Sequence, residues 1–260
     1  RPEQLGDWAD HVPESAATLA DACWPGPLTL VLARAPHVPD AVTGGLDTVG
    51  LRVPDQPVAL ALLREFGGGV AAPSANRFGR VSPTTADDVR ADLGDDVDVV
   101  LDDGPSRVGV ESTIVDCSRP EPAILRLGGV PRERVEELLD ARVPLLDAGE
   151  VRAPGTLDAH YSPHARVELV DDASAAVRIA GALAHGARVG VVALEVPARL
   201  DAAVEVVGNP TDVDAYAHSL YRYLRDVDAR ALDVVFVVPP PAVGLGAAVA
   251  DRLRRAAGAR

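Results

Sequence analysis

Lysine and methionine are both absent from this sequence of 260 residues. All 25 positively charged side chains are arginine, so chemistry through a lysine amine is excluded within these residues. Methionine does not occur even at position 1. Because translation begins with methionine, we expect the sequence to be a fragment whose N-terminal segment is missing.

Cysteines are few, and long apolar runs and an excess of positive charge are missing. No apolar run reaches the ~18 residues that a membrane span needs, and no signal peptide opens the chain. Cys23 and Cys117 are too few for a disulfide scaffold or a metal framework, which is typical of a reducing cytoplasm. The formal charge of -14 disfavours stable nucleic-acid binding, since that binding depends on many Lys and Arg contacts to phosphate. We therefore expect a cytoplasmic protein with no membrane contact and no stable direct contact to nucleic acid.

The chain does contain enough apolar residues for two cores. Hydrophobic residues make up 47% of it, and its length exceeds the ~100 to 200 residues of a typical single domain. In the first half, several predicted strands follow one another without a helix between them, which predicts an α/β fold with a twisted mixed sheet. The strands predicted here are 28–33, 48–53, 69–73, 98–104, 112–117 and 123–128, and the helices are 14–23, 57–66, 84–93 and 131–139.

Periodicity fails between residues 143 and 166, a segment with three Pro and two Gly. This pattern predicts a long interdomain linker between a first domain, 1–142, and a second, 167–260. Long connections are often functional, so we expect the linker, which carries His160, Tyr161 and His164, to be ordered over another part of the protein.

Strands and amphipathic helices alternate beyond the linker, which predicts a small Rossmann-like parallel α/β domain. One helix, 212–228, has apolar residues at the helical period that should face the core: Tyr216, Leu220, Tyr223, Leu224 and Val227. The predicted strands are 166–170, 188–194, 203–208 and 233–238, and the helices are 173–185, 212–228 and 246–257.

The stretch "VAAPSANRFGRVSPTT", residues 70–85, runs from a predicted strand into a predicted helix. Such a junction leaves backbone N–H groups unpaired at the helix N-terminus, and these bind anions. A capped strand–loop–helix joint is the alternative interpretation. The polar side chains available to a ligand are Ser74, Asn76, Arg77, Arg80, Ser82 and Thr84.

Other polar residues interrupt strands. In "TVGLRVPD" the period of two places Thr48, Gly50 and Arg52 on one face, opposite the apolar residues. Guanidinium groups suit carboxylates and phosphates, although an exposed face of an edge strand is the alternative. Ser112 in "VGVESTIVD" and Arg126 in "AILRLGG" lie at strand ends. Together these residues predict the lining of one cleft on a shared sheet.

Other signals for chemistry are weaker. His160 and His164 have a spacing seen in zinc sites, but Pro163 disfavours a helix and no third ligand follows. The sequence has no Walker P-loop, no G-x-S-x-G and no G-x-G-x-x-G, and "VGLGAAV" indicates a turn before the last helix. We therefore predict no metal ligands from these residues.

Several motifs resemble the YrdC/Sua5 family, the L-threonylcarbamoyladenylate synthases. They are "WPGPLTLVL", "VGLRVPDQPVALALL", "AAPSANRFGRVSPTTADDV", "VGVESTIVD" and "ILRLGGV". "APGTLDAHYSPHA" resembles the linker of the two-domain Sua5 branch, and "GLGAAVADRLRRAA" resembles the end of its C-terminal domain. The resemblance covers essentially the whole chain.

The resemblance implies a YrdC-like domain followed by a Sua5 C-terminal domain. It implies a nucleotidyltransferase that joins L-threonine, bicarbonate and ATP, with Mg²⁺, into threonylcarbamoyl-AMP and pyrophosphate. The adenylate would pass to a TsaD-type transferase for t6A modification of tRNA at position 37. Carried over to this sequence, the threonine-binding residues would be Arg52, Ala72 and Ser112, and the ATP-binding residues Thr48, Ser74, Ser82, Arg126 and Tyr161.

One departure from the family leaves the activity of these residues open. The family begins with a further strand–helix unit carrying a Thr-rich segment and a Lys-x-Arg motif, and neither is found here. A non-catalytic module that binds RNA or a protein partner is therefore an alternative. A carbamoyl-phosphate-dependent maturation enzyme is a third interpretation, but its acylphosphatase-like and zinc-finger segments are missing.

Overall fold

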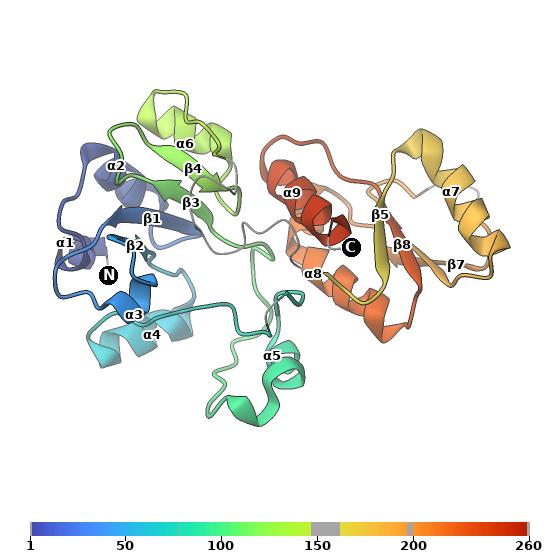
Figure 1. Ribbon diagram of the computed structural model, residues 1–260, viewed down its shortest axis with the longest axis horizontal. Coiled ribbons are helices and arrows are strands. Elements are labelled where there is room, and N and C mark those ends of the chain that lie inside the picture. Colours follow the sequence, from blue (N-terminus) through green and yellow to red (C-terminus); the bar gives the residue numbers. More distant parts are fainter. Residues whose placement is uncertain (1, 78, 147–161, 197–199, 259–260) are drawn as a thin grey trace. The chain divides into compact units, whose positions relative to one another are not determined.

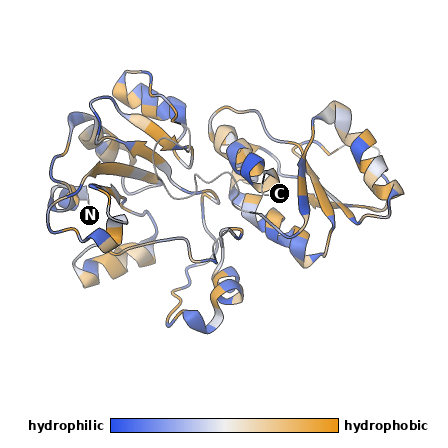
Figure 2. Ribbon diagram, in the orientation of Figure 1, coloured by the Kyte–Doolittle hydropathy of each residue, from blue (hydrophilic) through white to orange (hydrophobic). Residues whose placement is uncertain are grey.

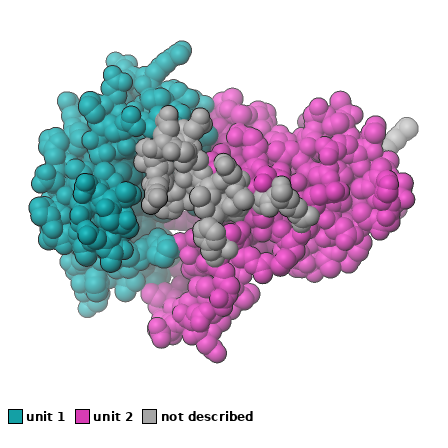
Figure 3. All heavy atoms as spheres, viewed as in Figure 1, with its two compact units in different colours: residues 1–73, 111–156 teal, residues 74–110, 157–260 magenta. Residues whose placement is uncertain are grey.

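The computed structural model describes residues 2–77, 79–146, 162–196 and 200–258. The chain divides into two compact units, residues 1–73 with 111–156 and residues 74–110 with 157–260 (Figure 3). Segment 74–110 thus groups with the C-terminal part of the chain, whereas sequence analysis placed it within 1–142. The predicted linker falls largely outside the described residues, so the domain boundaries stay predictions.

A mixed four-stranded sheet forms the centre of the first unit, as predicted (Figure 1). β1 is antiparallel to β2 and parallel to β3, and β3 is antiparallel to β4. On β1 the residues Leu28, Leu30 and Leu32 are completely buried, so one face of this strand supplies the core. The strands are β1 (Leu28–Ala33), β2 (Thr48–Leu51), β3 (Thr113–Asp116) and β4 (Ala123–Arg126), in the order β2-β1-β3-β4.

Helices of the first unit begin and end at residues with clear local causes. α4 (Pro57–Phe66) starts where the Gln56 side chain accepts a hydrogen bond from Ala59 N, and it ends at Gly67 in the left-handed conformation. α2 (Glu14–Cys23) packs on α6 (Arg132–Leu139) and buries Leu19. The unit also contains a 3₁₀ turn at Pro2–Gln4, α1 (Leu5–Trp8) and α3 (Asp40–Thr43), which sequence analysis missed.

The second unit is built on a parallel sheet of four strands, which confirms the Rossmann-like prediction (Figure 1). Its strands are largely hydrophobic in Figure 2. The strand order is β5-β8-β6-β7, with β5 (Arg166–Leu169), β6 (Val189–Val192), β7 (Val204–Gly208) and β8 (Val234–Val237). The helices of this unit are α5 (Ala86–Leu93), followed by a 3₁₀ turn at Gly94–Asp96, α7 (Asp172–Ala184), α8 (Val213–Ala229) and α9 (Leu245–Ala257).

Alternation along the strands divides the second unit into three layers. Val235 and Val237 pack with residues of α8 and α9, whereas Val234 and Phe236 pack with residues of α7. α8 was predicted to bury one stripe of apolar residues, and this is confirmed. Its buried residues include Tyr216, Leu220, Tyr223, Leu224 and Val227.

Two predicted strands, 69–73 and 98–104, are wrong, since neither segment joins a ladder in the described structure. A strand needs a hydrogen-bonded neighbour and a covered face. Val70, Val99 and Leu101 are instead 50%, 72% and 57% exposed. The aliphatic residues of these two segments therefore suggested buried strands, but the side chains are exposed in the structure.

Cys117 and Trp24 are both buried in the core of the first unit, as sequence analysis of their residue types suggests. Cys117 is completely buried, and this burial raises the pKa of its thiol to about 11, so it acts as a small apolar residue. Trp24 is buried in the first unit and donates a hydrogen bond from Nε1 to Leu28 O over 2.7 Å. Among the described helices, none has the length and apolar character that crossing a membrane requires.

Candidate functional site

A row of polar residues crosses the sheet of the first unit. Thr29 on β1 shares a hydrogen bond of 2.7 Å between its Oγ1 and Ser112 Oγ, just before β3. Arg126 on β4 donates from Nη2 to Ser112 Oγ over 3.2 Å. Gly50 on the neighbouring strand β2 lies beside Thr29, since a Cβ added at Gly50 would lie 3.4 Å from the Thr29 methyl group. The fold therefore brings together Ser112 and Arg126, which the sequence predicted as separate polar interruptions.

Arg126 is buried, with 9% of its surface exposed. It donates to the carbonyl oxygen of Ser112 from Nε over 3.2 Å and from Nη2 over 3.0 Å. A buried guanidinium needs such partners because an unpaired charge in the interior is costly. The residue therefore fixes both the backbone and the hydroxyl of Ser112, and it brings a permanent positive charge to the row.

Close backbone approach holds Ser112 in place from a second direction. Gly128, just after β4, lies so near the chain that an added Cβ would overlap backbone atoms of Glu111, Ser112 and Thr113. Thr113 reinforces this contact: its Oγ1 donates to Val130 O and accepts from Val130 N, over 2.5 and 3.0 Å. The "LGGV" turn therefore packs against the start of β3 and fixes its position.

β2 presents its predicted polar face. Val49 and Val53 are each 6% exposed and buried in the unit, while Thr48, Gly50 and Arg52 alternate with them. Arg52 directly follows β2, an edge strand of the described sheet, and it is exposed, so the alternative interpretation of Arg52 as an exposed edge residue is consistent with its position. Its Nε nevertheless donates to Gly26 O over 3.0 Å. Desolvation lowers the pKa of Arg52, and the nearby Asp55 opposes that shift.

Thr29 is the member of this row that sequence reasoning missed. The signal was present in "LTLVL", where one polar residue stands in an apolar strand and alternation places it opposite the buried leucines. The rule of alternation that identified Thr48, Gly50 and Arg52 would have found it.

Thr29→Val is expected to lower the free energy of unfolding by about 1 kcal/mol, because Ser112 loses one hydrogen-bond partner while the volume is kept. Thr29→Ser retains the hydroxyl and serves as the control. Urea unfolding of both variants measures the difference, and a Thr29→Val variant as stable as the wild type would show that the hydrogen bond to Ser112 contributes nothing.

The loop at residues 74–85 belongs to the second unit. Ser74 is exposed and Ser82 is buried. At the start of α5 the backbone N–H groups of Thr84 and Thr85 donate to Asp88 Oδ2, over 2.9 and 3.0 Å. These donors are therefore occupied by the protein's own carboxylate, so the capped-joint interpretation is confirmed at this end of the loop.

Asn76 organises the middle of the same loop. Its Nδ2 donates to Arg77 O and to Arg80 O, each over 3.1 Å. Its Oδ1 is buried and has no hydrogen-bond partner among the described residues. Asn76 therefore shapes the loop between Ser74 and Ser82, whose contacts to a ligand stay predictions.

The remaining predicted residues are not linked to this row. Ala72 is exposed in a segment without regular structure. His160 and Tyr161 lie outside the described residues. His164 bonds to Asp228 and Arg80, and the described part of the chain has no group of three His, Cys, Asp or Glu side chains that could hold a metal ion.

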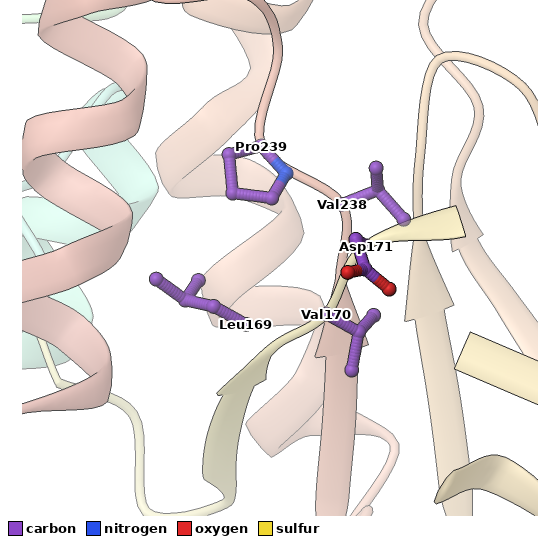
Figure 4. Close-up of a pocket in the computed structure, with 5 residues that line it drawn as sticks. All are labelled: Leu169, Val170, Asp171, Val238 and Pro239. Carbon is purple, nitrogen blue, oxygen red and sulfur yellow. The ribbon is translucent and has the colours of Figure 1, made fainter. Parts of the chain in front are cut away.

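A separate cavity of about 460 Å³ lies at the carboxyl ends of β5 and β8 (Figure 4). Leu169, Val170, Val238 and Pro239 line it, and Asp171 is its charged residue. The Asp171 carboxylate caps α7 by accepting from Ser174 N over 2.7 Å. Hydrogen bonds from the Ser174 hydroxyl and, to a lesser degree, from the Ser174 backbone N–H lower the pKa of Asp171. Its carboxylate is thus explained by helix capping, and the cavity gives no argument for a ligand.

Comparison with known proteins places both parts of the chain. The Sua5/YciO/YrdC family model, described as "Telomere recombination", matches residues 1–128. A second family model, described as "Threonylcarbamoyl-AMP synthase, C-terminal domain", matches residues 130–258. Nearly the whole described sequence is therefore similar to two families that carry these descriptions.

Full-length relatives give the same result. The chain is 39% identical to the threonylcarbamoyl-AMP synthase of Pyrococcus abyssi, covering 99% of this chain and 78% of the relative. It is 38% identical to the synthase of that name from Bacillus subtilis, covering 99% and 77%. The crystal structure of P. abyssi Sua5 complexed with L-threonine matches with a TM-score of 0.90 at 37% identity, covering 99% of this chain and 78% of that chain.

Proposed function

The chain belongs to the Sua5 family of threonylcarbamoyl-AMP synthases, and we propose that it makes this product from L-threonine, bicarbonate and ATP. It is an enzyme of the nucleotidyltransferase type. The observation that carries the proposal is the match of 99% of the chain to a Sua5 whose structure contains L-threonine.

The proposed chemistry needs no protein nucleophile. The threonine amine attacks the carbon of bicarbonate, and loss of water leaves a carbamate. A carbamate oxygen then attacks the α-phosphorus of ATP, the bond to the bridging oxygen breaks, and pyrophosphate leaves. The protein contributes positioning and stabilisation of developing negative charge, which suits a site built from arginines and hydroxyls.

In this proposal the polar row of the first unit holds the reacting groups. Arg52 pairs with the threonine carboxylate, while Ala72 and Ser112 line the amino-acid site. Arg126 and Thr48 contact ATP. The link from Arg126 to Ser112 supports this assignment, because one buried guanidinium then serves both substrates. Ser74, Ser82 and Tyr161 are the remaining proposed ATP contacts.

Mg²⁺ is proposed to arrive with ATP. Since the described residues offer no cluster of metal ligands, the ion would be held by phosphate oxygens and water. Bound in that way, it would neutralise phosphate charge. We further propose a cytoplasmic location and transfer of the adenylate to a TsaD-type enzyme for t6A37 formation in tRNA.

Pyrophosphate release by the purified 260-residue chain tests the function. The chain is incubated with ATP and Mg²⁺, and threonine and bicarbonate are added separately and then together. Release that requires both supports the proposal. Release that does not depend on threonine contradicts the proposal, and the absence of release would favour a non-catalytic binding module.

Arg52→Ala is expected to raise the KM for threonine about tenfold while the KM for ATP changes less than about twofold, since a carboxylate loses its charged partner. Arg52→Lys is the control, because it keeps the charge but not the planar fork. Steady-state pyrophosphate release measures both constants, and equal increases in the two KM values would refute this role.

A further inference from the structure

Both ends of segment 74–110 are attached to one helix of the second unit, α8. Near the first end Val81 is buried, and near the second end Val110 is buried. Both belong to the hydrophobic cluster that contains Tyr221 and Leu224 of α8. The segment that carries Ser74 and Ser82 is thus packed into the core of the C-terminal part of the chain.

Arg225 of α8 makes the most direct polar contact with this segment. Its Nη2 donates to Val81 O over 2.5 Å and to Asp92 Oδ2 over 2.9 Å. Its Nε lies 3.7 Å from Asp88 Oδ1. One guanidinium therefore joins the loop backbone beside Ser82 to two carboxylates of α5, one of which caps that helix.

Asp228, one turn further along α8, holds the loop through a second route. Its carboxylate accepts from His164 N over 2.8 Å and contacts His164 Nδ1 over 3.0 Å. The other ring nitrogen of His164 lies 2.8 Å from Arg80 Nη1. Arg80 is thereby linked to α8 two residues before Ser82.

The far end of the segment approaches the backbone of α8 itself. An added Cβ at Gly109 would overlap the carbonyl oxygens of Ala217 and His218, and Gly109 has a φ of +77°. His218 Nδ1 lies 2.8 Å from Arg107 O. Direct contacts near both ends therefore fix the segment to α8, over sequence separations of 144 residues for Arg225 and Val81 and 111 residues for His218 and Arg107.

We propose that α8 is the platform of the nucleotide loop and that Arg225 is a positioning residue for ATP binding. This inference rests on the proposed function, since it assumes that Ser74 and Ser82 contact ATP. Arg225 fixes the carbonyl group directly before Ser82, so the orientation of the Ser82 backbone and hydroxyl depends on a side chain that touches no substrate. The C-terminal domain then acts on the reaction by shaping this loop.

The test compares Arg225→Ala, Arg225→Lys and Arg222→Ala in the whole chain. Arg222 lies on the same helix, is exposed and contacts Ser219 and Tyr223 instead of the loop, so its loss is the matched control. Pyrophosphate release gives KM for ATP, KM for threonine and kcat. Calorimetric titration with ATP gives affinity, and hydrogen exchange reports the opening of residues 79–85.

Arg225→Ala is expected to raise KM and Kd for ATP about tenfold, with KM for threonine within about twofold, because a charge-assisted hydrogen bond to the loop is lost. Amides 79–85 should exchange faster in this variant alone. Arg225→Lys should recover part of the affinity, and Arg222→Ala should match the wild type.

Each outcome has a distinct meaning. The inference is overturned if Arg225→Ala has the same hydrogen exchange at residues 79–85 and the same affinity for ATP as the wild type. It is also overturned by an equal loss of affinity for ATP and threonine, which would indicate general destabilisation. If the wild type releases no pyrophosphate on addition of threonine, the proposed function fails. In that case hydrogen exchange still tests whether α8 positions the loop. Unchanged exchange at residues 79–85 in Arg225→Ala contradicts this role of α8, and faster exchange supports it.

Discussion

Replacing Arg126 with alanine is expected to reduce the rate of threonine-dependent pyrophosphate release by about a hundredfold. Two kinds of interaction are lost together. The side chain is buried and donates to both the carbonyl and the hydroxyl of Ser112, so its removal leaves these acceptors short of a donor. In our proposal it also supplies positive charge to ATP. A loss of about 3 kcal/mol, the upper end for a hydrogen bond to a charged group, corresponds to that factor.

Arg126→Lys separates the two contributions. Lysine keeps the charge but cannot form the forked contact to the Ser112 carbonyl. We expect the kcat/KM of Arg126→Lys to lie between those of Arg126→Ala and the wild type. Thermal unfolding is measured in parallel, so that a variant that is merely unfolded is recognised. A folded Arg126→Ala enzyme with unchanged kinetics would remove Arg126 from the site.

Gly128→Ala is expected to destabilise the first unit by about 3 kcal/mol, at the upper end for overpacking. The added methyl group would overlap backbone atoms of Glu111, Ser112 and Thr113. Because none of these atoms belongs to a side chain that can rotate away, the start of β3 must move. The same movement displaces Ser112, so activity should fall with stability.

Gly6→Ala is the matched control for this substitution. Gly6 lies in α1 of the same unit, and no heavy atom lies within 4 Å of an added Cβ. Its effect on the free energy of unfolding should stay within about 1 kcal/mol, the scale of helix propensity. Urea unfolding compares the two variants. If Gly128→Ala were as stable as Gly6→Ala, the close approach after β4 would not be a real constraint.

Local signals predicted the elements of the fold well. Pro57 and the glycines from Gly67 onward marked both ends of α4, because their backbone preferences act within one turn. The apolar stripe of α8 was equally visible, since burial on one helix face repeats every three to four residues. The predicted elements that occur have ends within two residues of those observed.

The site was predicted only in part, because its geometry depends on pairing between distant residues. Ser112 and Arg126 were found as polar residues in apolar strands, but their contact follows from the antiparallel pairing of β3 with β4. Arg225 lies 144 residues after Val81, and no periodic pattern links the two. Segments 69–73 and 98–104 were wrongly predicted as strands. Their composition is typical of strands, but a strand also needs a neighbouring strand to pair with, and composition does not show whether the fold provides one.

The chain leaves its first unit after residue 73 and returns to it at residue 111. Ribosomes add about 5 to 20 residues per second, so the segment between these points is made about 5 to 20 s before α8, which begins at Val213. During that interval α8 has not yet been synthesised, so the newly made loop lacks the helix on which it packs. The strands β3 and β4, which follow the loop in the sequence, are already available for pairing. The order of synthesis therefore makes this loop one of the last regions to reach its final shape, although it lies in the first half of the chain.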